Sequence, residues 1–327
     1  MRFILWMGLV LGLLWGSYWF VGSVAIENGV TQWFADSQAQ GLTAENEGIA
    51  VSGFPSRFDL TVTNPRLADP ILGIGWKAPF AQVLSMTWKP WHVIAVLPMD
   101  QEIEAAGQRI AVTTSKMAAS LRLKPFTNLT FQELVIEAHD LALTSDLGWK
   151  SGVKAMVLAL ADERSATFSA RLGLDVMDLR PDPQLTGRLM GLGDVVRQIH
   201  LDASLGLSAG LDRHIAETRP QITQLTVHDF KLTWGKLQLK AKGKIEPDLD
   251  GLAQGMIDFE VTNWQEIPEL AVALELIRPE MAASLMDGFR TLIKPGADPD
   301  VLNLPLTFSN GWMTLGPLPL GPAPMLN

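Results

Sequence analysis

One segment of the chain has the residue spacing of a serine nucleophile, because Gly206-Leu207-Ser208-Ala209-Gly210 matches the G-x-S-x-G pattern. In enzymes with this pattern, a sharp turn between a parallel strand and a helix exposes the serine hydroxyl to a histidine base. His214 and His228 follow with Asp212 and Asp229 beside them, so the residue types of a catalytic triad are present. Apolar and polar residues alternate through the motif, however, which predicts a strand with Ser208 on its outward face. A serine hydrolase using Ser208 is therefore the least favoured of three functional hypotheses.

The spacing of histidine and the absence of cysteine predict no metal site. The sequence has no cysteine, and no two of its five histidines have the helical i, i+4 spacing: His92, His139, His200, His214 and His228. A zinc site needs three or four convergent ligands. We therefore expect no metal or other cofactor. Because the serine motif is also disfavoured, we expect a protein that is not an enzyme.

The clearest structural signal is a pair of alternating segments in the second half of the chain. From Leu237 to Ile245, apolar residues or glycine occupy the odd positions and lysine or glutamine the even ones. The same parity returns from Ile257 to Val261, where the even positions are acidic. This period of two predicts strands with one apolar and one polar face. Antiparallel pairing would set Lys240 opposite Glu260 and Lys242 opposite Asp258, and such pairs contribute roughly 0.2–1 kcal/mol each.

Short segments with this period begin at Ile49 and recur through most of the chain, including a segment from Ile222 to Trp234. They predict a mainly β protein with a few helices: a long antiparallel, curved, one-sided β-sheet or groove. Pro181 and Pro183 favour a boundary between a first β-rich half, 41–180, and a second, 181–327. A short helix is expected over 189–198.

The end of the chain is expected to contain a helix and a hairpin. Apolar residues recur every three or four positions over 266–293, which predicts a late amphipathic helix kinked near Pro279. Asn310-Gly311 is a typical two-residue hairpin turn. The prolines that follow are expected to end the sheet, because proline donates no hydrogen bond to a neighbouring strand.

The apolar face of the predicted sheet is the candidate binding surface. Its members are predicted from strand parity to be Leu237, Leu239, Ile245, Ile257, Phe259, Val261, Phe168, Leu172 and Leu174. In an open groove this face would hold phospholipid or acyl chains, whereas in a closed sandwich it would be an ordinary core. The periodicity is the same in both cases, so the sequence leaves both interpretations open.

The amino terminus has the composition of a membrane segment. No charged residue lies between Arg2 and Glu27, and the apolar run from Phe3 to Val24 would span roughly 33 Å as a helix. A cleavable signal peptide has a shorter apolar stretch of about 7–15 residues. We therefore predict a transmembrane anchor over 1–25, although Ser23-Val24-Ala25 is an acceptable cleavage site for a signal peptide. Helical spacing continues over 26–40, which predicts a helical stalk.

Charge predicts the orientation of this anchor. Arg2 precedes it and acidic residues follow it, which places the N-terminus in the cytoplasm and the bulk of a single-pass protein outside, in the periplasm. Gly8, Gly12 and Gly16 form a smooth seam on which a second helix could pack, giving a homodimer through the anchor. The formal charge of −9 argues against nucleic acid as a partner, since binding phosphates requires a basic surface.

Three motifs resemble an uncharacterised family found chiefly in alphaproteobacteria, domain of unknown function 2125 (DUF2125), associated with the AsmA-like group of envelope proteins. The motifs are Gly53-Phe54-Pro55-Ser56-Arg57-Phe58, Thr233-Trp234-Gly235-Lys236-Leu237 and Thr314-Leu315-Gly316-Pro317-Leu318-Pro319-Leu320-Gly321-Pro322-Ala323-Pro324. The AsmA-like likeness implies an anchor in the bacterial inner membrane and a curved sheet with an apolar groove, implicated in lipid movement or envelope integrity. It implies no catalytic residue.

The leading hypothesis is therefore a non-enzymatic protein of the bacterial inner membrane that binds or shields lipid, or another apolar ligand, in envelope maintenance. The alternative is an envelope scaffold with a closed β core whose partners bind at sheet edges.

Overall fold

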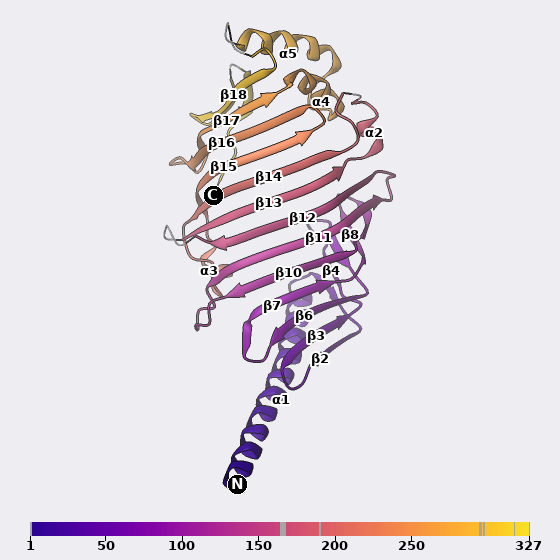
Figure 1. Ribbon diagram of the computed structural model, residues 1–327, viewed down its shortest axis with the longest axis vertical. Coiled ribbons are helices and arrows are strands. Elements are labelled where there is room, and N and C mark those ends of the chain that lie inside the picture. Colours follow the sequence, from indigo (N-terminus) through magenta and orange to yellow (C-terminus); the bar gives the residue numbers. More distant parts are fainter. Residues whose placement is uncertain are drawn as a thin grey trace. The chain divides into compact units, whose positions relative to one another are not determined.

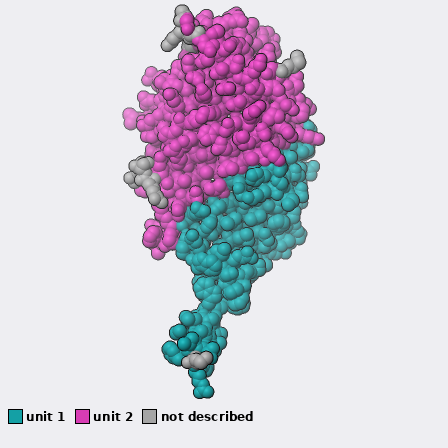
Figure 2. All heavy atoms as spheres, in the orientation of Figure 1, with its two compact units in different colours: residues 1–123, 136–148 teal, residues 124–135, 149–327 magenta. Residues whose placement is uncertain are grey.

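The computed structural model describes residues 2–163, 168–189, 191–293, 296, 298–316 and 318–326. It is mainly an antiparallel β-sheet that is not closed, with 52% of residues in strands and 22% in helices. The chain forms two compact units (Figure 2). Unit 1 contains residues 1–123 and 136–148, and unit 2 contains residues 124–135 and 149–327. The boundary expected at residue 180 lies inside unit 2, at the end of strand β13 (Ser169–Arg180).

The amino terminus forms one continuous helix, α1 (Arg2–Ala39), drawn in indigo in Figure 1. This helix is long and apolar enough to cross a membrane. Its second half does not stand free as a stalk, because it packs against strands of unit 1 and buries Phe34 with Ala44, Leu60 and Val62.

Unit 1 contains two antiparallel arrays of strands. The first array is β2 (Gly48–Ser52), β3 (Arg57–Thr63), β6 (Phe80–Met86), β7 (Lys89–Leu97) and β10 (Lys116–Leu123). The second is β1 (Thr43–Glu45), β4 (Arg66–Asp69), β5 (Ile74–Lys77), β8 (Asp100–Ala105), β9 (Gln108–Thr113) and the end of β11 (Phe131–Ser145). In β3 the alternation predicted from sequence is confirmed, since Phe58, Leu60 and Val62 are buried.

Unit 2 is a meander in which each strand from β12 onward pairs with the next (Figure 1). Its strands are β12 (Lys150–Asp162), β13, β14 (Val196–Leu207), β15 (Ile222–Trp234), β16 (Leu237–Pro247), β17 (Ala253–Thr262), β18 (Val301–Ser309), β19 (Trp312–Leu315) and β20 (Leu318–Pro322). The register predicted from charge is confirmed: Lys240 lies opposite Glu260, with Nζ 2.9 Å from Oε1, and Lys242 lies opposite Asp258.

The C-terminal hairpin is also confirmed, with Ser309 paired to Trp312 around the Asn310-Gly311 turn. Both turn residues have positive φ, as this type of two-residue turn requires. The expectation that the following prolines end the sheet was wrong, because β20 continues it and sets Pro319 opposite Thr314. The described residues pair β20 with β19 alone, and proline is tolerated on such an edge strand.

Several predicted helix bounds require correction. The span 266–293 is two helices, α4 (Ile267–Ala273) and α5 (Pro279–Leu292), preceded by the single-turn helix η1 (Trp264–Glu266). Pro279 does not kink a helix but begins one, where its missing N–H costs nothing. Residues 189–198 contain no helix among those described, and the short helix of this region is α2 (Pro183–Thr186) instead.

Candidate functional site

The predicted apolar face exists in unit 2, but helices and the C-terminal segment cover much of it. Leu237 and Val261 are buried in a cluster with Trp264 and Phe289, and Leu239 and Phe259 pack against this cluster. Ile245 is buried in a second cluster that includes Ala323, and Ile257 packs against it. These positions therefore form part of the core, as in an ordinary packed sheet.

Leu172 and Leu174 belong to a part of the face that stays half-buried. Leu172 lies opposite Ala203 of β14, which in turn lies opposite Val227 of β15. The adjacent row contains Leu174, Leu201 and Phe230. Leu172 and Leu174, rather than the covered positions, are the part of the predicted face that could contact a ligand.

Strand parity does not place the side chain of Phe168, because this residue lies outside a strand. It precedes β13, has a positive φ of 53°, and its side chain is half-exposed. Its ring lies within 3.4 Å of where a Cβ on Gly210 would be, and it lines a separate pocket.

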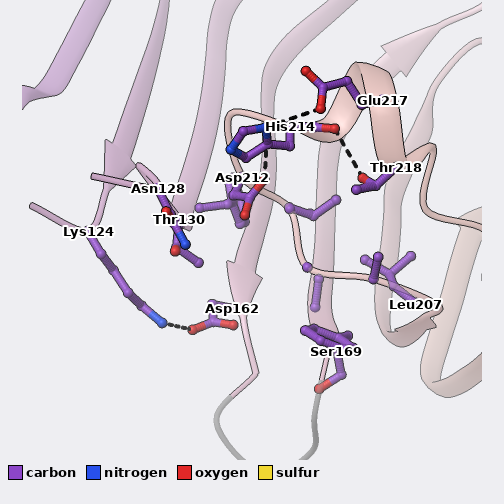
Figure 3. A pocket seen from close by; sticks show the side chains of 16 residues that line it. Lys124, Asn128, Thr130, Asp162, Ser169, Leu207, Asp212, His214, Glu217 and Thr218 are labelled. Atoms are coloured by element: carbon purple, nitrogen blue, oxygen red, sulfur yellow. Dashed lines mark hydrogen bonds and ion pairs between the residues drawn. The ribbon is translucent and has the colours of Figure 1, made fainter. Parts of the chain in front are cut away.

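That pocket, with a volume of about 610 Å³, lies within unit 2 between β12, β13, β14 and the loop that follows β14 (Figure 3). Backbone hydrogen bonds hold the loop to the start of β11 and to the segment before it: Phe131 N–H to Leu211 O at 2.7 Å and Arg213 N–H to Asn128 O at 3.2 Å. Apolar lining comes from Phe131, Phe168, Ala170, Leu207 and Leu211. The volume lies in the range of small-molecule sites.

The charged side chains of this pocket are mostly acidic. Lys124 Nζ lies 2.7 Å from Asp162 Oδ2, and His214 Nδ1 lies 3.3 Å from Glu217 Oε2, as the dashed lines in Figure 3 show. Asp212 also lines the pocket and accepts the His214 backbone N–H. One lysine facing three carboxylates favours a neutral or cationic ligand group over an anion.

The serine of the G-x-S-x-G motif lacks the geometry of a nucleophile elbow. Ser208 lies just after β14, where its backbone N–H donates to Gln221 O and its Oγ accepts the Gln221 N–H, both at 2.9 Å. The helix that follows in the loop, α3 (Ile215–Thr218), has four residues and does not begin at the motif. The strand-to-helix turn that the hydrolase hypothesis requires is therefore missing at Ser208.

A different serine–histidine pair, which the sequence did not reveal, lies on the polar side of β14 and β15. Ser204 is buried, and its Oγ lies 2.7 Å from His228 Nε2. Among the described residues, no carboxylate is hydrogen-bonded to the His228 ring, so the third member of a triad is lacking. Strand parity could not reveal this pair, because the pairing of β14 with β15 shifts register next to His228.

Asp202 and Arg171 form a bidentate ion pair beside this serine and histidine. Arg171 Nε donates to Asp202 Oδ1 at 2.7 Å and its Nη2 to Oδ2 at 2.5 Å. The hydrogen bond from Arg171 lowers the pKa of Asp202, and the positive charge of the guanidinium adds to the effect.

This pKa shift predicts a pH-dependent contribution to stability. A lowered folded pKa stabilises the fold above the ordinary aspartate pKa of about 3.9, and the contribution is lost as the pH falls through the folded value. Asp202→Asn should therefore lower the free energy of unfolding at pH 7 by about 0.2–1 kcal/mol, the range for exposed pairs. The difference from the unsubstituted protein should shrink below about pH 4 in urea titrations. Arg171→Gln with Asp202→Asn is the control, which should show no such pH dependence.

Unit 1 contains an apolar pocket of about 450 Å³ beside the second half of α1. Its floor is a row of register partners across β1, β4, β5 and β8: Ala44, Leu67, Trp76 and Ile103. Its remaining lining is Trp33, Ser37, Leu42, Thr43, Ala68, Asp69, Ile74 and Gly75. The Trp76 indole N–H is satisfied by Gln101 Oε1 at 2.9 Å, so the ring adds apolar surface without an unpaired donor.

Three aromatic side chains attach the first half of α1 to the rest of unit 1. Trp15 Nε1 donates to Pro55 O at 2.9 Å, Tyr18 Oη to Thr87 O at 2.9 Å, and Trp19 Nε1 to Arg57 O at 2.7 Å. Trp19 also packs against the rings of Phe54 and Phe58. We call these three side chains the aromatic clamp.

The predicted glycine seam lies on the same helix. No described atom outside the helix approaches the positions where a Cβ on Gly8 or Gly12 would lie, whereas that of Gly16 faces the Phe54 ring at 3.9 Å. The seam is thus open along its first part and meets unit 1 at its last glycine.

Among the described residues, no group of three or more His, Asp or Glu side chains is arranged to hold a metal ion.

Fold and site together define a mainly antiparallel β protein with an open sheet and an N-terminal helix long enough to cross a membrane. Residues 19–324 match the model of a family described as "Uncharacterized protein conserved in bacteria (DUF2125)", and the chain belongs to that family. No curated protein and no solved structure matches the chain. The matched region begins at Trp19, inside α1, so it includes part of the aromatic clamp.

Proposed function

We propose that this protein is a single-pass membrane protein, anchored by α1, that binds the acyl chain of a lipid without catalysing a reaction. We place it in the bacterial inner membrane with its N-terminus in the cytoplasm and both units in the periplasm, and we group it with AsmA-like envelope proteins. The apolar N-terminal segment and the charges that flank it support this placement.

The observation that carries the proposal is the apolar pocket of unit 1. Most of its lining residues are apolar, its volume suits an acyl chain or a similar ligand, and one wall is the helix that would emerge from the membrane. Exposed apolar side chains lie beside it in the turn between β4 and β5, where Ile71 is 95% exposed and Leu72 is largely exposed. Moving an acyl chain through water costs about 0.8 kcal/mol per methylene, so a dry pocket next to the anchor would lower that cost.

A pocket variant and a matched control test this proposal. Ile74 lines the pocket and is half-exposed, so Ile74→Glu should fold while it places a carboxylate where the chain would lie. We expect acyl-chain affinity to fall by about thirtyfold, because losing the contact and burying a charge costs at least about 2 kcal/mol. Ile71→Glu, which adds the same charge in the turn just before β5 but outside the pocket, should bind normally.

Binding can be measured with a fatty acid that carries a photoreactive diazirine, added to the full-length protein in vesicles of phosphatidylethanolamine and phosphatidylglycerol. After illumination, mass spectrometry should find the label on peptides containing Trp33 to Ala44 and Leu67 to Trp76. Equal labelling of both glutamate variants, or labelling confined to Phe3 to Val24, would show that the pocket does not bind the chain.

The alternative function is an interaction scaffold, and the covered face of unit 2 favours it. Both apolar clusters there are closed by other parts of the chain, as a packed core is. On this alternative, partners bind at sheet edges, and two anchors pair along the open seam at Gly8 and Gly12. Labelling that is absent from both units outside the segment from Phe3 to Val24 would favour the scaffold.

A further inference from the structure

The aromatic clamp has a consequence for where unit 1 must lie relative to a bilayer. In α1, the segment from Phe3 to Leu14 is exposed along its whole length and is therefore free to be surrounded by lipid. Twelve helical residues span only about 18 Å, whereas the hydrocarbon core of a bilayer is about 30 Å thick. If α1 crosses the membrane, the helix between Trp15 and about Gly22 must also lie at membrane depth, together with whatever is attached to it.

Two turns of unit 1 are attached to that part of the helix. They are Gly53–Ser56, between β2 and β3, and Thr87-Trp88, between β6 and β7. The clamp residues bond to Pro55, to Thr87 and to Arg57, which follows the first turn. The turns are also bonded to each other, with Thr87 N–H donating to Ser56 O at 3.1 Å. We call this pair of turns the tip of unit 1.

The composition of the tip suits the lipid interface. Phe54 and Trp88 are each 56% exposed, and Met86 beside them is also exposed. Arg57 and Lys89 lie next to these apolar side chains with exposed side chains of their own. Aromatic side chains with neighbouring basic groups are typical of the boundary between acyl chains and headgroups.

The backbone hydrogen bonding of the tip also suits a site with little water. A carbonyl in lipid must find its donor within the protein. Gly53 O accepts the N–H groups of Ser56 and Arg57, and Ser56 O accepts that of Thr87. The carbonyls of Pro55, Arg57 and Thr87 are the acceptors of the three clamp side chains. Pro55 itself has no N–H to satisfy.

We propose that the tip of unit 1 is inserted in one leaflet of the bilayer, beside the anchor, so that a lipid surface covers Phe54 and Trp88. This inference rests on the proposed anchoring by α1 and goes further, because it fixes the depth of the folded domain. The insertion sets unit 1 against the membrane instead of suspending it on a stalk.

Depth-dependent fluorescence quenching tests the proposal on the full-length protein. Because the chain has no cysteine, single-cysteine variants accept one environment-sensitive dye each. The sites are Phe54→Cys and Trp88→Cys in the tip, Val10→Cys in the free part of α1, and Leu147→Cys, an exposed apolar position elsewhere in unit 1. The proteins are placed in vesicles of phosphatidylethanolamine and phosphatidylglycerol that contain a nitroxide-labelled phospholipid.

We expect dyes at Phe54, Trp88 and Val10 to show a blue-shifted emission and to lose most of it to the nitroxide, while the dye at Leu147 does neither. The dye at Trp88 is a second probe of the tip. It leaves intact the Trp19–Phe54 contact, whose removal in Phe54→Cys could loosen the clamp. Quenching at Val10 without quenching at Phe54 and Trp88 would overturn the tip insertion and leave the anchoring intact. Without quenching at Val10, the anchoring proposal itself fails, and the tip insertion with it.

Discussion

Trp264→Ala is expected to lower the free energy of unfolding of unit 2 by about 3–5 kcal/mol, the cost of removing a large buried aromatic side chain. Trp264 is 2% exposed and is the largest fully buried side chain among the described residues. Its ring meets that of Phe289 edge to face at 5.8 Å, and its Nε1 donates to Pro299 O at 3.0 Å. The side chain therefore joins α5 and the segment before β18 to the apolar face of the sheet.

Urea unfolding of the full-length protein in detergent, followed by circular dichroism, measures this effect. Trp264→Phe keeps most of the ring contact but loses the N–H donor, so its effect should be smaller. The matched control is Trp312→Ala, because Trp312 is also in unit 2 but is 57% exposed. If Trp312→Ala proved as destabilising as Trp264→Ala, the assignment of the main core of unit 2 to the cluster around Trp264 would be wrong.

The strands and their register were predictable because each depends on a repeat of two residues that the sequence displays directly. The bounds of β15, Ile222–Trp234, agree with the prediction, and Lys240 lies opposite Glu260 as the charges indicated. Where the pairing of β14 with β15 shifts register, the alternation of residues no longer predicts which side chains meet. The contact between Ser204 and His228 was therefore not predicted.

The helices were less predictable because their ends depend on single backbone conformations. Spacing at three or four residues runs through 266–293 without interruption, yet the chain turns between α4 and α5, where Glu275 adopts a positive φ of 60°. A glutamate gives no signal for such a conformation, which glycine and asparagine usually occupy.

The attachment of α1 to unit 1 could not be predicted from periodicity at all. Trp15, Tyr18 and Trp19 lie within the apolar N-terminal segment, and their hydrogen-bond acceptors lie 38 to 69 residues further along the chain. The unit 1 pocket could not be predicted for the same reason, because its wall and floor come from α1 and four separate strands. Apolar residues predict burial, but they do not specify which distant surface buries them.

Removal of residues 2–25, the segment that a signal peptidase would release, is expected to destabilise unit 1 by at least about 3–5 kcal/mol. It deletes the whole aromatic clamp, including Trp19, which is 6% exposed, and it uncovers the buried Phe58 ring. The carbonyls of Pro55, Arg57 and Thr87 would lose their side-chain donors at the same time. A fold that depends on these residues argues for an anchor that is kept.

Hydrogen exchange and limited proteolysis of the detergent-purified protein measure the consequence. Peptides that cover β2, β3 and the turn between them should exchange faster and be cleaved sooner in the variant that lacks 2–25. Removal of residues 2–14 alone is the matched control, because it deletes exposed helix and leaves the clamp in place. That control should keep the exchange pattern of the full chain.

The same argument predicts the processing of the protein in cells. Because Trp15, Tyr18 and Trp19 are part of the folded unit, peptides from Phe3 to Ala25 should remain on the membrane-bound chain, and mass spectrometry of the purified protein can detect them. A mature chain that begins at Ile26 and still protects β2 and β3 from exchange would show that the clamp is dispensable. The anchor and the fold of unit 1 would then be independent, and the segment before Ile26 would serve for export alone.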